Sequence, residues 1–251
     1  MMKPNSKELV IGVDLDLWNG YGVKHPVTTP ITPDTNTHMI INGVSGSGKT
    51  FLEQIIIRNL IMADEEDDSI FYFADYKGDD SFAYLRKAPR YYSYNNTLKA
   101  LDEVYAILNS RLSGDLGRET VTLVWDEYMA NILSLVNVDK KLATATMNKV
   151  SEILLMGRSM GVRLIVSCQR ADAVAFPTGS RLNFGIIVII GSYQKSIYEM
   201  LMPDHKDQVE GRILNRGEGT VLLQGTQLHF IKVPLVRHVD KMQQLCLKAL
   251  S

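Results

Sequence analysis

Apolar and polar positions along this chain form a repeating pattern that predicts strands separated by helices. Several short segments are almost wholly apolar, as in strands that are buried on both faces of a sheet. Between them, longer segments carry apolar residues at helical spacing: Leu98, Leu101 and Leu108 fall on one face of 97–112. This order favours an α/β fold with a mainly parallel sheet flanked by helices and a short β-rich C-terminal extension. The predicted strands are 37–43, 68–75, 120–127, 162–169, 184–191, 220–225 and 227–236, and the predicted helices are 51–63, 97–112, 145–160 and 239–249.

The composition is that of an ordinary globular protein. Of the 251 residues, 45% are hydrophobic and 22% are charged, which excludes disorder, collagen and a coiled coil as descriptions of the whole chain. The net charge of −1 argues against a protein that coats nucleic acid with its whole surface, but not against local basic patches. Cys168 and Cys246 lack the spacing of a disulfide framework or a zinc site. No apolar run approaches the roughly 20 residues that span a bilayer, so we expect a cytoplasmic protein without membrane insertion.

The segment GVSGSGKT, residues 43–50, predicts a nucleotide phosphate site. It matches G-x-x-x-x-G-K-[ST] and lies between a predicted strand and a predicted helix, as that pattern requires. Its glycines let backbone amides point at phosphate oxygens, and the following helix adds its positive end. Lys49 is expected to reach the β- and γ-phosphates of ATP, and the Thr50 hydroxyl to bind Mg²⁺. The predicted nucleotide-binding residues of this loop are Gly43, Val44, Ser45, Gly46, Ser47, Gly48, Lys49 and Thr50.

Two carboxylates follow the apolar strand in VTLVWDEY, residues 121–128. Open α/β sheets bind ligands at the carboxyl ends of their strands, where Asp126 and Glu127 would lie. Asp126 is expected to help bind the nucleotide by holding Mg²⁺, and Glu127 to polarise the attacking water. An apolar strand followed by Asp-Glu is common, so a solvated strand end is the alternative interpretation.

A third segment, GRSMGVRLIVSCQRAD (157–172), places polar residues on both sides of a strand. Gln169 lies at the carboxyl tip, where it can sense the γ-phosphate or the attacking water. Arg158 precedes the strand, so it is better placed to act on a neighbouring subunit's phosphates than on its own. A surface arginine or a helix C-cap is the alternative for Arg158.

In this order, the motifs resemble the motor domain of the FtsK/SpoIIIE family, within the FtsK–HerA class of RecA-like ATPases. The resemblance covers roughly residues 8–240, and the order of the motifs is far more specific than any one of them. It implies a RecA-like P-loop NTPase fold, with 1–36 as a β-rich lead-in and 37–251 as the ATPase motor domain. The segments that carry it are the lead-in to GVSGSGKT with His38, YFADYKGD with Asp75 and Lys77, VWDEY, RSMGVRLIVSCQR with Arg158 and Gln169, and GRILNRGEGTVLL (211–223).

The chain also departs from the family pattern. Ala171 stands where family members often have proline, and apolar residues near 186–188 replace a further arginine. Arg181 and Arg216 are candidates for that missing role. Large members carry membrane helices and a winged-helix domain that this chain has no room for. It therefore resembles a minimal stand-alone motor of the kind expected on plasmids, phages or integrative conjugative elements.

The resemblance implies a hexameric ring that hydrolyses ATP at subunit interfaces and moves double-stranded DNA through its lumen. Relaxase, replication or conjugation proteins are the implied further partners. Pore-facing loops are expected within 137–149 and 170–181, although ordinary solvated surface is the alternative for their basic residues. The predicted DNA contacts are Lys140, Lys141, Lys149, Arg170 and Arg181.

Three tyrosines, Tyr91, Tyr92 and Tyr94, are candidates for stacking on bases, but a partly buried edge strand is the favoured interpretation. Two other functional classes stay open. Relatives of this motor pump proteins, as in type VII secretion, or act as coupling ATPases. A nucleotide-binding assembly protein without hydrolysis is the third class, against which Glu127, Arg158 and Gln169 argue.

Overall fold

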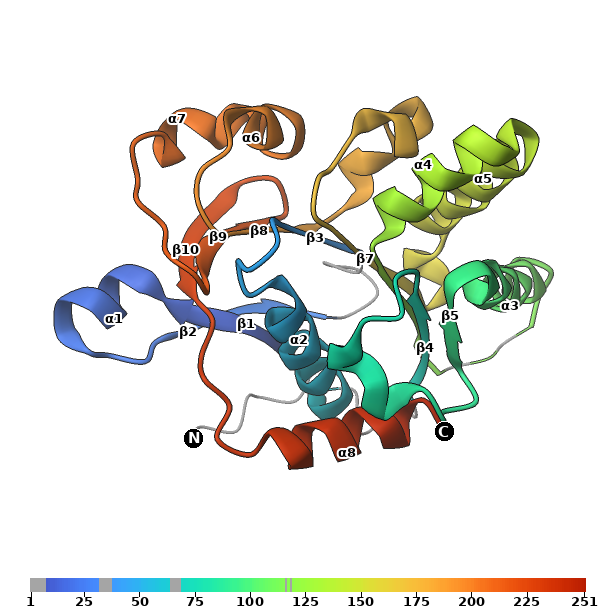
Figure 1. The fold of residues 1–251 in the computed structure, drawn as a ribbon, viewed down its shortest axis with the longest axis horizontal. Helices are drawn as coiled ribbons and strands as arrows, with labels where there is room; N and C mark the ends of the chain where they lie inside the picture. The colour runs from blue at the N-terminus through green and yellow to red at the C-terminus, as the bar shows by residue number, and fades with distance from the viewer. Residues whose placement is uncertain (1–7, 32–37, 64–68, 116, 118) are drawn as a thin grey trace.

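A mixed sheet runs through the molecule (Figure 1). The computed structural model describes residues 8–31, 38–63, 69–115, 117 and 119–251. Within these residues the sheet has ten strands, in the order β2-β1-β10-β9-β8-β3-β7-β6-β4-β5. The strands are β1 (Glu8–Asp14), β2 (Pro26–Pro30), β3 (Met39–Gly43), β4 (Ile70–Asp75), β5 (Tyr91–Ser93), β6 (Val121–Asp126), β7 (Val162–Cys168), β8 (Ile186–Ile190), β9 (Glu218–Leu223) and β10 (Gln227–Lys232).

The half of the sheet from β8 to β5 is parallel, and the half from β9 to β2 is antiparallel. β3 and β7 are buried along their whole length, which explains why their sequences are mostly apolar. The hairpin of β9 and β10 forms the predicted β-rich extension. The lead-in strands β1 and β2 join the same sheet through pairing of β1 with β10.

Helices cover both faces of the sheet. In Figure 1, α2 and α8 lie on one side of the sheet, and α4, α5, α6 and α7 lie on the other. Successive residues of β3 point to opposite faces: Ile40 packs with the core beneath α3 and α5, whereas Met39 and Ile41 pack with α2 and α8. The helices are α1 (Leu15–Tyr21), α2 (Lys49–Ala63), α3 (Thr97–Leu112), α4 (Tyr128–Val138), α5 (Lys140–Met156), α6 (Lys195–Leu201), α7 (Lys206–Val209) and α8 (Val239–Ala249).

The segment after the acidic motif differs from the expectation. The predicted helix 145–160 is the second of two helices, and the segment 137–149, predicted as a pore loop, is mostly helical. Asp139 separates the two helices: its extended backbone ends α4, and its side chain caps α5 by accepting from the amides of Lys141 and Leu142. The helix α5 then ends at Met156. No helix in the described part of the chain combines the length and the hydropathy needed to cross a membrane.

Candidate nucleotide-binding site

The candidate site lies at the edge where β3, β7 and β6 have their carboxyl ends. These three strands are neighbours and run parallel, so the residues that follow them meet at one edge of the sheet. The loop after β3, residues 43–50, leads directly into α2 and is called the phosphate loop below. This topology brings Lys49, Asp126 and Gln169 to the same edge.

Glycines allow the phosphate loop to adopt its path. Gly46 and Gly48 have φ of 78° and 100°, values that other residues rarely adopt. A side chain on Gly43 would place its Cβ 2.7 Å from Ser47 Oγ and 3.1 Å from the Ile190 carbonyl oxygen. The amide of Ser47 donates to the Val44 carbonyl at 3.1 Å and closes the turn. Because α2 begins at Lys49, its positive end faces the loop.

The turn before β9 supports the phosphate loop from the side. The amide of Gly217 donates to the Ser47 carbonyl at 2.8 Å. Glu218 is buried and accepts from the backbone and the side chain of Asn215, both at 3.0 Å, and from Lys232 at 3.0 Å. Burial alone would raise the pKa of Glu218, but these hydrogen bonds outweigh it, and the pKa is lowered. The charged side chain of Glu218 therefore holds the turn in place.

This turn distinguishes the two candidates for the missing family arginine. Arg216 is exposed and directly precedes Gly217, so it lies beside the phosphate loop. Arg181 lies in a short 3₁₀ helix that packs against α5 and leads into the amino end of β8. Only Arg216 is at the nucleotide edge.

A buried cluster of charges lies at the mouth of the phosphate loop. Lys49 Nζ lies 2.8 Å from Asp126 Oδ1 and 3.2 Å from Glu127 Oε1, and Lys77 Nζ lies 3.3 Å from Glu127 Oε2. Burial favours a lower pKa for Lys49, but the neighbouring carboxyl groups outweigh it and hold the pKa above its ordinary value. Lys49 is therefore a fixed positive charge between two acidic side chains.

Glu53 and Ser167 complete this cluster and were missed at the sequence level. Ser167 Oγ donates to Asp126 Oδ1 at 2.5 Å and accepts from Lys49 at 3.2 Å. Glu53 Oε2 lies 3.3 Å from the same hydroxyl oxygen, and Glu53 has no exposed surface. Burial, reinforced by Asp126, raises the pKa of Glu53 well above its ordinary value. The Ser167 hydroxyl therefore lies within hydrogen-bonding distance of both carboxyl groups, and the raised pKa favours the protonated form of Glu53. The available signals were a glutamate four residues after Lys49 on an otherwise apolar helix and a serine within an apolar strand.

Glu127 has a backbone conformation unusual for its residue type. Its φ of 54° and ψ of 37° are left-handed, and it occupies the N-cap position of α4 without a capping side-chain hydrogen bond. A left-handed non-glycine residue stores strain of about 1–3 kcal/mol, and such residues concentrate at functional sites. In this backbone conformation the carboxylate of Glu127 forms ion pairs with Lys49 and Lys77.

Known proteins share this architecture, although no protein-family model matches the chain. The chain is 26% identical over 213 residues to the FtsK domain-containing protein YdcQ of Bacillus subtilis (strain 168), across 75% of this chain and 42% of that protein. Among solved structures, the pCW3 conjugation coupling protein TcpA, in its monomer form with ATPγS, superposes with a TM-score of 0.73. That match has 17% identity and covers 99% of this chain and 72% of TcpA. The chain has the FtsK-like P-loop ATPase fold.

The cytoplasmic domain of the type VII secretion ATPase EccC from Thermomonospora curvata is a further match. Its TM-score is 0.66 at 17% identity, over 100% of this chain and 32% of EccC. The predicted resemblance to the FtsK/SpoIIIE family and the predicted α/β P-loop fold are thus confirmed. The chain spans less than half the length of the curated relative YdcQ.

Two residues carried over from the FtsK-like pattern lie at opposite ends of β7. Gln169 directly follows β7 and is half-buried at the nucleotide edge. Arg158 is exposed and begins a 3₁₀ turn before β7. A seven-residue strand spans on the order of 20 Å, so Arg158 is too far from the phosphate loop of its own chain to contact a nucleotide there.

The five predicted DNA contacts lie on two segments of the chain. Lys140 and Lys141 are exposed at the start of α5, and Lys149, further along it, pairs with Asp102 at 2.7 Å. Arg170 is exposed after β7, and Arg181 is half-buried beside α5. The structure therefore leaves Lys140, Lys141 and Arg170 as the most accessible cations of the set.

The donor set at this edge fits Mg²⁺ rather than a metal held by protein alone. Thr50 offers a hydroxyl and Asp126 a carboxylate, which are the hard oxygen ligands that Mg²⁺ prefers. In the described ranges, no group of three or more His, Cys, Asp or Glu side chains is arranged to hold a metal. Mg²⁺ commonly binds through one or two protein oxygens together with substrate phosphates and water.

Proposed function

We propose that this chain is an FtsK-like ATP hydrolase that acts in a hexameric ring to move double-stranded DNA. The observation that supports this most directly is the buried cluster in which Lys49 pairs with both Asp126 and Glu127 beside the phosphate loop. Phosphate binding needs Lys49, but a second acidic residue held at the same point is needed for hydrolysis. The cluster combines both.

In this proposal, nucleotide binding rearranges the ion pairs of Lys49. The amides of the phosphate loop and the positive end of α2 bind the phosphates. Lys49 leaves the carboxylates and pairs with the β- and γ-phosphates, while Ser167 keeps Asp126 oriented. When bound, Mg²⁺ held by Thr50 and Asp126 supplies positive charge to the phosphate oxygens.

Glu127 then serves as the general base. It takes a proton from the water that attacks the γ-phosphorus, and the bond from that phosphorus to the bridging oxygen breaks, releasing ADP and phosphate. Lys77 holds one carboxylate oxygen of Glu127 at 3.3 Å and fixes its direction. Gln169 donates to the attacking water or to the γ-phosphate.

Arg158 supplies the last charge from a neighbouring subunit. It is exposed at the edge opposite its own phosphate loop, so a second copy of the chain is needed to bring an arginine to the site. An arginine finger of this kind is worth on the order of 10³–10⁵ in rate. A head-to-tail interface of this type generates a ring when the rotation between successive subunits closes.

The test is the steady-state rate of ATP hydrolysis with and without double-stranded DNA, at low and moderate salt. We expect strong stimulation that weakens with salt, because the DNA contacts are charged. Lys49→Ala is expected to abolish nucleotide binding or hydrolysis, and Glu127→Gln to bind ATP without turning it over. Hydrolysis in Glu127→Gln at the wild-type rate would contradict the base assignment.

A second candidate function is a coupling or protein-pumping ATPase. The structural likeness to the conjugation coupling protein TcpA and to the type VII secretion ATPase EccC favours it. Hydrolysis that ignores duplex DNA would support this second function. Nucleotide binding without any hydrolysis would instead indicate an assembly protein.

A further inference from the structure

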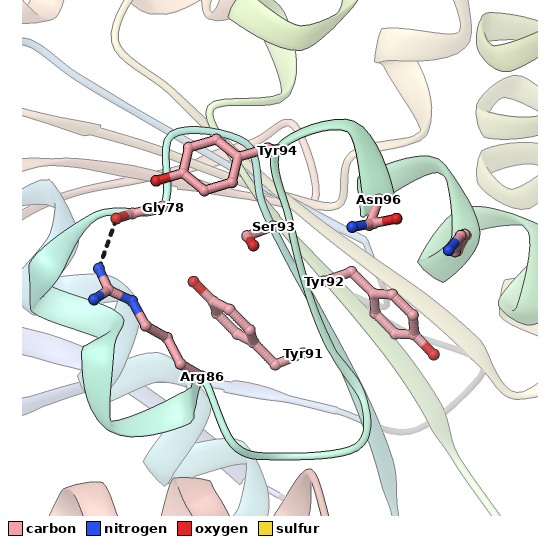
Figure 2. Close-up of a pocket in the computed structure, with 8 residues that line it drawn as sticks. Gly78, Arg86, Tyr91, Tyr92, Ser93, Tyr94 and Asn96 are labelled. Carbon is pink, nitrogen blue, oxygen red and sulfur yellow. Dashed lines mark hydrogen bonds between the residues drawn. The ribbon is translucent and has the colours of Figure 1, made fainter.

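A cavity of about 540 Å³ lies at β5, the edge strand of the parallel half of the sheet. It is separated from the phosphate loop by four strand spacings, roughly 19 Å. At Gly78 the lining directly follows Lys77, the partner of Glu127, so the cavity borders the nucleotide site there, but most of its lining comes from β5 and the segment that follows it. Its volume is within the usual range of small-ligand pockets, about 300–1,000 Å³. It is lined by Gly78, Arg86, Tyr91, Tyr92, Ser93, Tyr94, Asn96 and Lys99 (Figure 2).

The lining carries positive charge and free donors. It includes two cations and no carboxylate. Among the described residues, the side chains of Ser93, Asn96 and Lys99 make no hydrogen bond or ion pair, and Asn96 does not cap α3 although it occupies the N-cap position. Arg86 pairs with Asp80, but that carboxylate is almost fully exposed, and exposed pairs contribute little. An anionic group would satisfy these donors.

Two acidic groups beside the cavity are engaged by its tyrosines. Tyr91 donates its hydroxyl to Asp75 at 2.6 Å, and Tyr92 donates to Glu103 at 2.6 Å. Burial and the hydrogen bond to Glu103 raise the pKa of Tyr92 to about 12, so this hydroxyl stays protonated and keeps donating. The two carboxylates are therefore turned to the tyrosines and do not oppose an anion in the cavity.

Tyr94 presents an aromatic face at the rim. Its φ of 52° is left-handed, and its side chain is 57% exposed. Figure 2 shows its ring near Gly78, and a Cβ on Gly78 would lie 2.3 Å from the Tyr94 hydroxyl oxygen. Strained backbone conformations of this kind cluster at active sites and at segments that clamp ligands.

We propose that this cavity binds one nucleotide unit of a single-stranded nucleic acid. The two phosphates that flank the nucleotide lie one on Arg86 and one on Lys99, and its base stacks on Tyr94, the combination of cations and aromatic rings by which proteins hold single strands. The site goes beyond the proposed function, which concerns ATP and duplex DNA.

The test is fluorescence anisotropy of a labelled single-stranded oligonucleotide, without ATP, over a range of salt concentrations. Arg86→Ala with Lys99→Ala is expected to lower affinity at least tenfold at low salt and to reduce the slope of log K against log salt by about 1.4, since each phosphate contact on a single strand contributes about 0.7. The control is Lys241→Ala with Lys248→Ala, which removes the same charge from exposed positions of α8 and is expected to bind like wild type.

A second pair of variants isolates the stacking contact. Tyr94→Asn removes the ring but tolerates a left-handed backbone, and Tyr94→Phe keeps the ring. We expect Tyr94→Asn to lose about tenfold in affinity with an unchanged salt slope, and Tyr94→Phe to retain binding.

Equal affinity and slope for the Arg86/Lys99 and the control variants would overturn the inference. Displacement of the labelled oligonucleotide by AMP but not by unlabelled oligonucleotide would also overturn it. So would binding of duplex DNA alone, with an affinity that Tyr94→Asn does not change. The proposed motor function is tested separately. Oligonucleotide binding that depends on Arg86 and Lys99, without hydrolysis of ATP, would contradict the motor function and support this site. DNA-stimulated hydrolysis, with unchanged oligonucleotide binding in the Arg86/Lys99 variant, would support the motor function and overturn this site.

Discussion

Glu53 is a buried acid beneath Lys49, and its protonation links the stability of the site to pH. Its charge would be uncompensated, because Lys49 and Lys77 already balance Asp126 and Glu127. The neutral form is therefore the form that fits the folded protein.

A raised pKa in the folded state has a definite effect on stability. The contribution of Glu53 is fully present below the ordinary glutamate pKa and is lost as pH rises through the raised pKa of the folded state. We expect the free energy of unfolding of Glu53→Gln, from urea titrations, to fall less with rising pH than that of wild type, because glutamine keeps the shape without the proton. Parallel pH profiles for the two proteins would contradict this prediction.

Glu53→Ala tests the hydrogen bond between Glu53 and Ser167. Removing the side chain takes a hydrogen-bond partner from Ser167 and opens a cavity, so we expect a loss of about 1–3 kcal/mol in the free energy of unfolding and weaker ATP binding. Glu53→Gln is the matched variant, and ATP affinity close to wild type is expected for it. ATP affinity is measured by isothermal titration; if glutamine and alanine weaken it equally, Glu53 does not act through Ser167.

Among the elements, the turn before β9 is the structural neighbour of the phosphate loop. Its Gly217 amide holds the Ser47 carbonyl, which places Arg216 at the nucleotide edge. We expect Arg216→Ala to weaken ATP binding by about tenfold, the effect of one charge-assisted contact. Arg181→Ala is the matched control and is expected to bind ATP like wild type, since Arg181 precedes β8 beside α5. The reverse ranking in a binding titration would reassign the missing family arginine.

The sequence predicted correctly those elements that are determined by residues close together in the chain. α3 and α8 have their predicted bounds because their apolar residues repeat at helical spacing, and the phosphate loop has a sequence signature with a fixed structural context. β5 has only three residues, too few for a period to show; as an edge strand it confirms the simpler interpretation of Tyr91 and Tyr92. The break between α4 and α5 depends on one capping aspartate, Asp139, within a continuous helical pattern.

The same sequence patterns could not predict contacts between segments that are far apart in the chain. Glu53 and Ser167 are 114 positions apart and meet only because β7 lies between β3 and β6. The support of the phosphate loop by Gly217 has the same origin, since it needs β9 to pair with β8. Strand order, rather than the composition of any segment, determines these parts of the site.

At the scale of the whole molecule, the separation of Arg158 from its own phosphate loop makes a prediction about mixtures. Lys49→Ala removes the phosphate-binding lysine but keeps Arg158, whereas Arg158→Ala keeps the phosphate loop and loses the finger. Each variant alone is expected to hydrolyse little ATP. In an equal mixture, about a quarter of head-to-tail interfaces join an intact loop to an intact finger, so hydrolysis should recover in part. Steady-state ATPase assays of the mixture against each variant measure this recovery.

Wild-type activity of Arg158→Ala alone would remove the finger assignment. A mixture no more active than the sum of its components would argue that each subunit completes its own site.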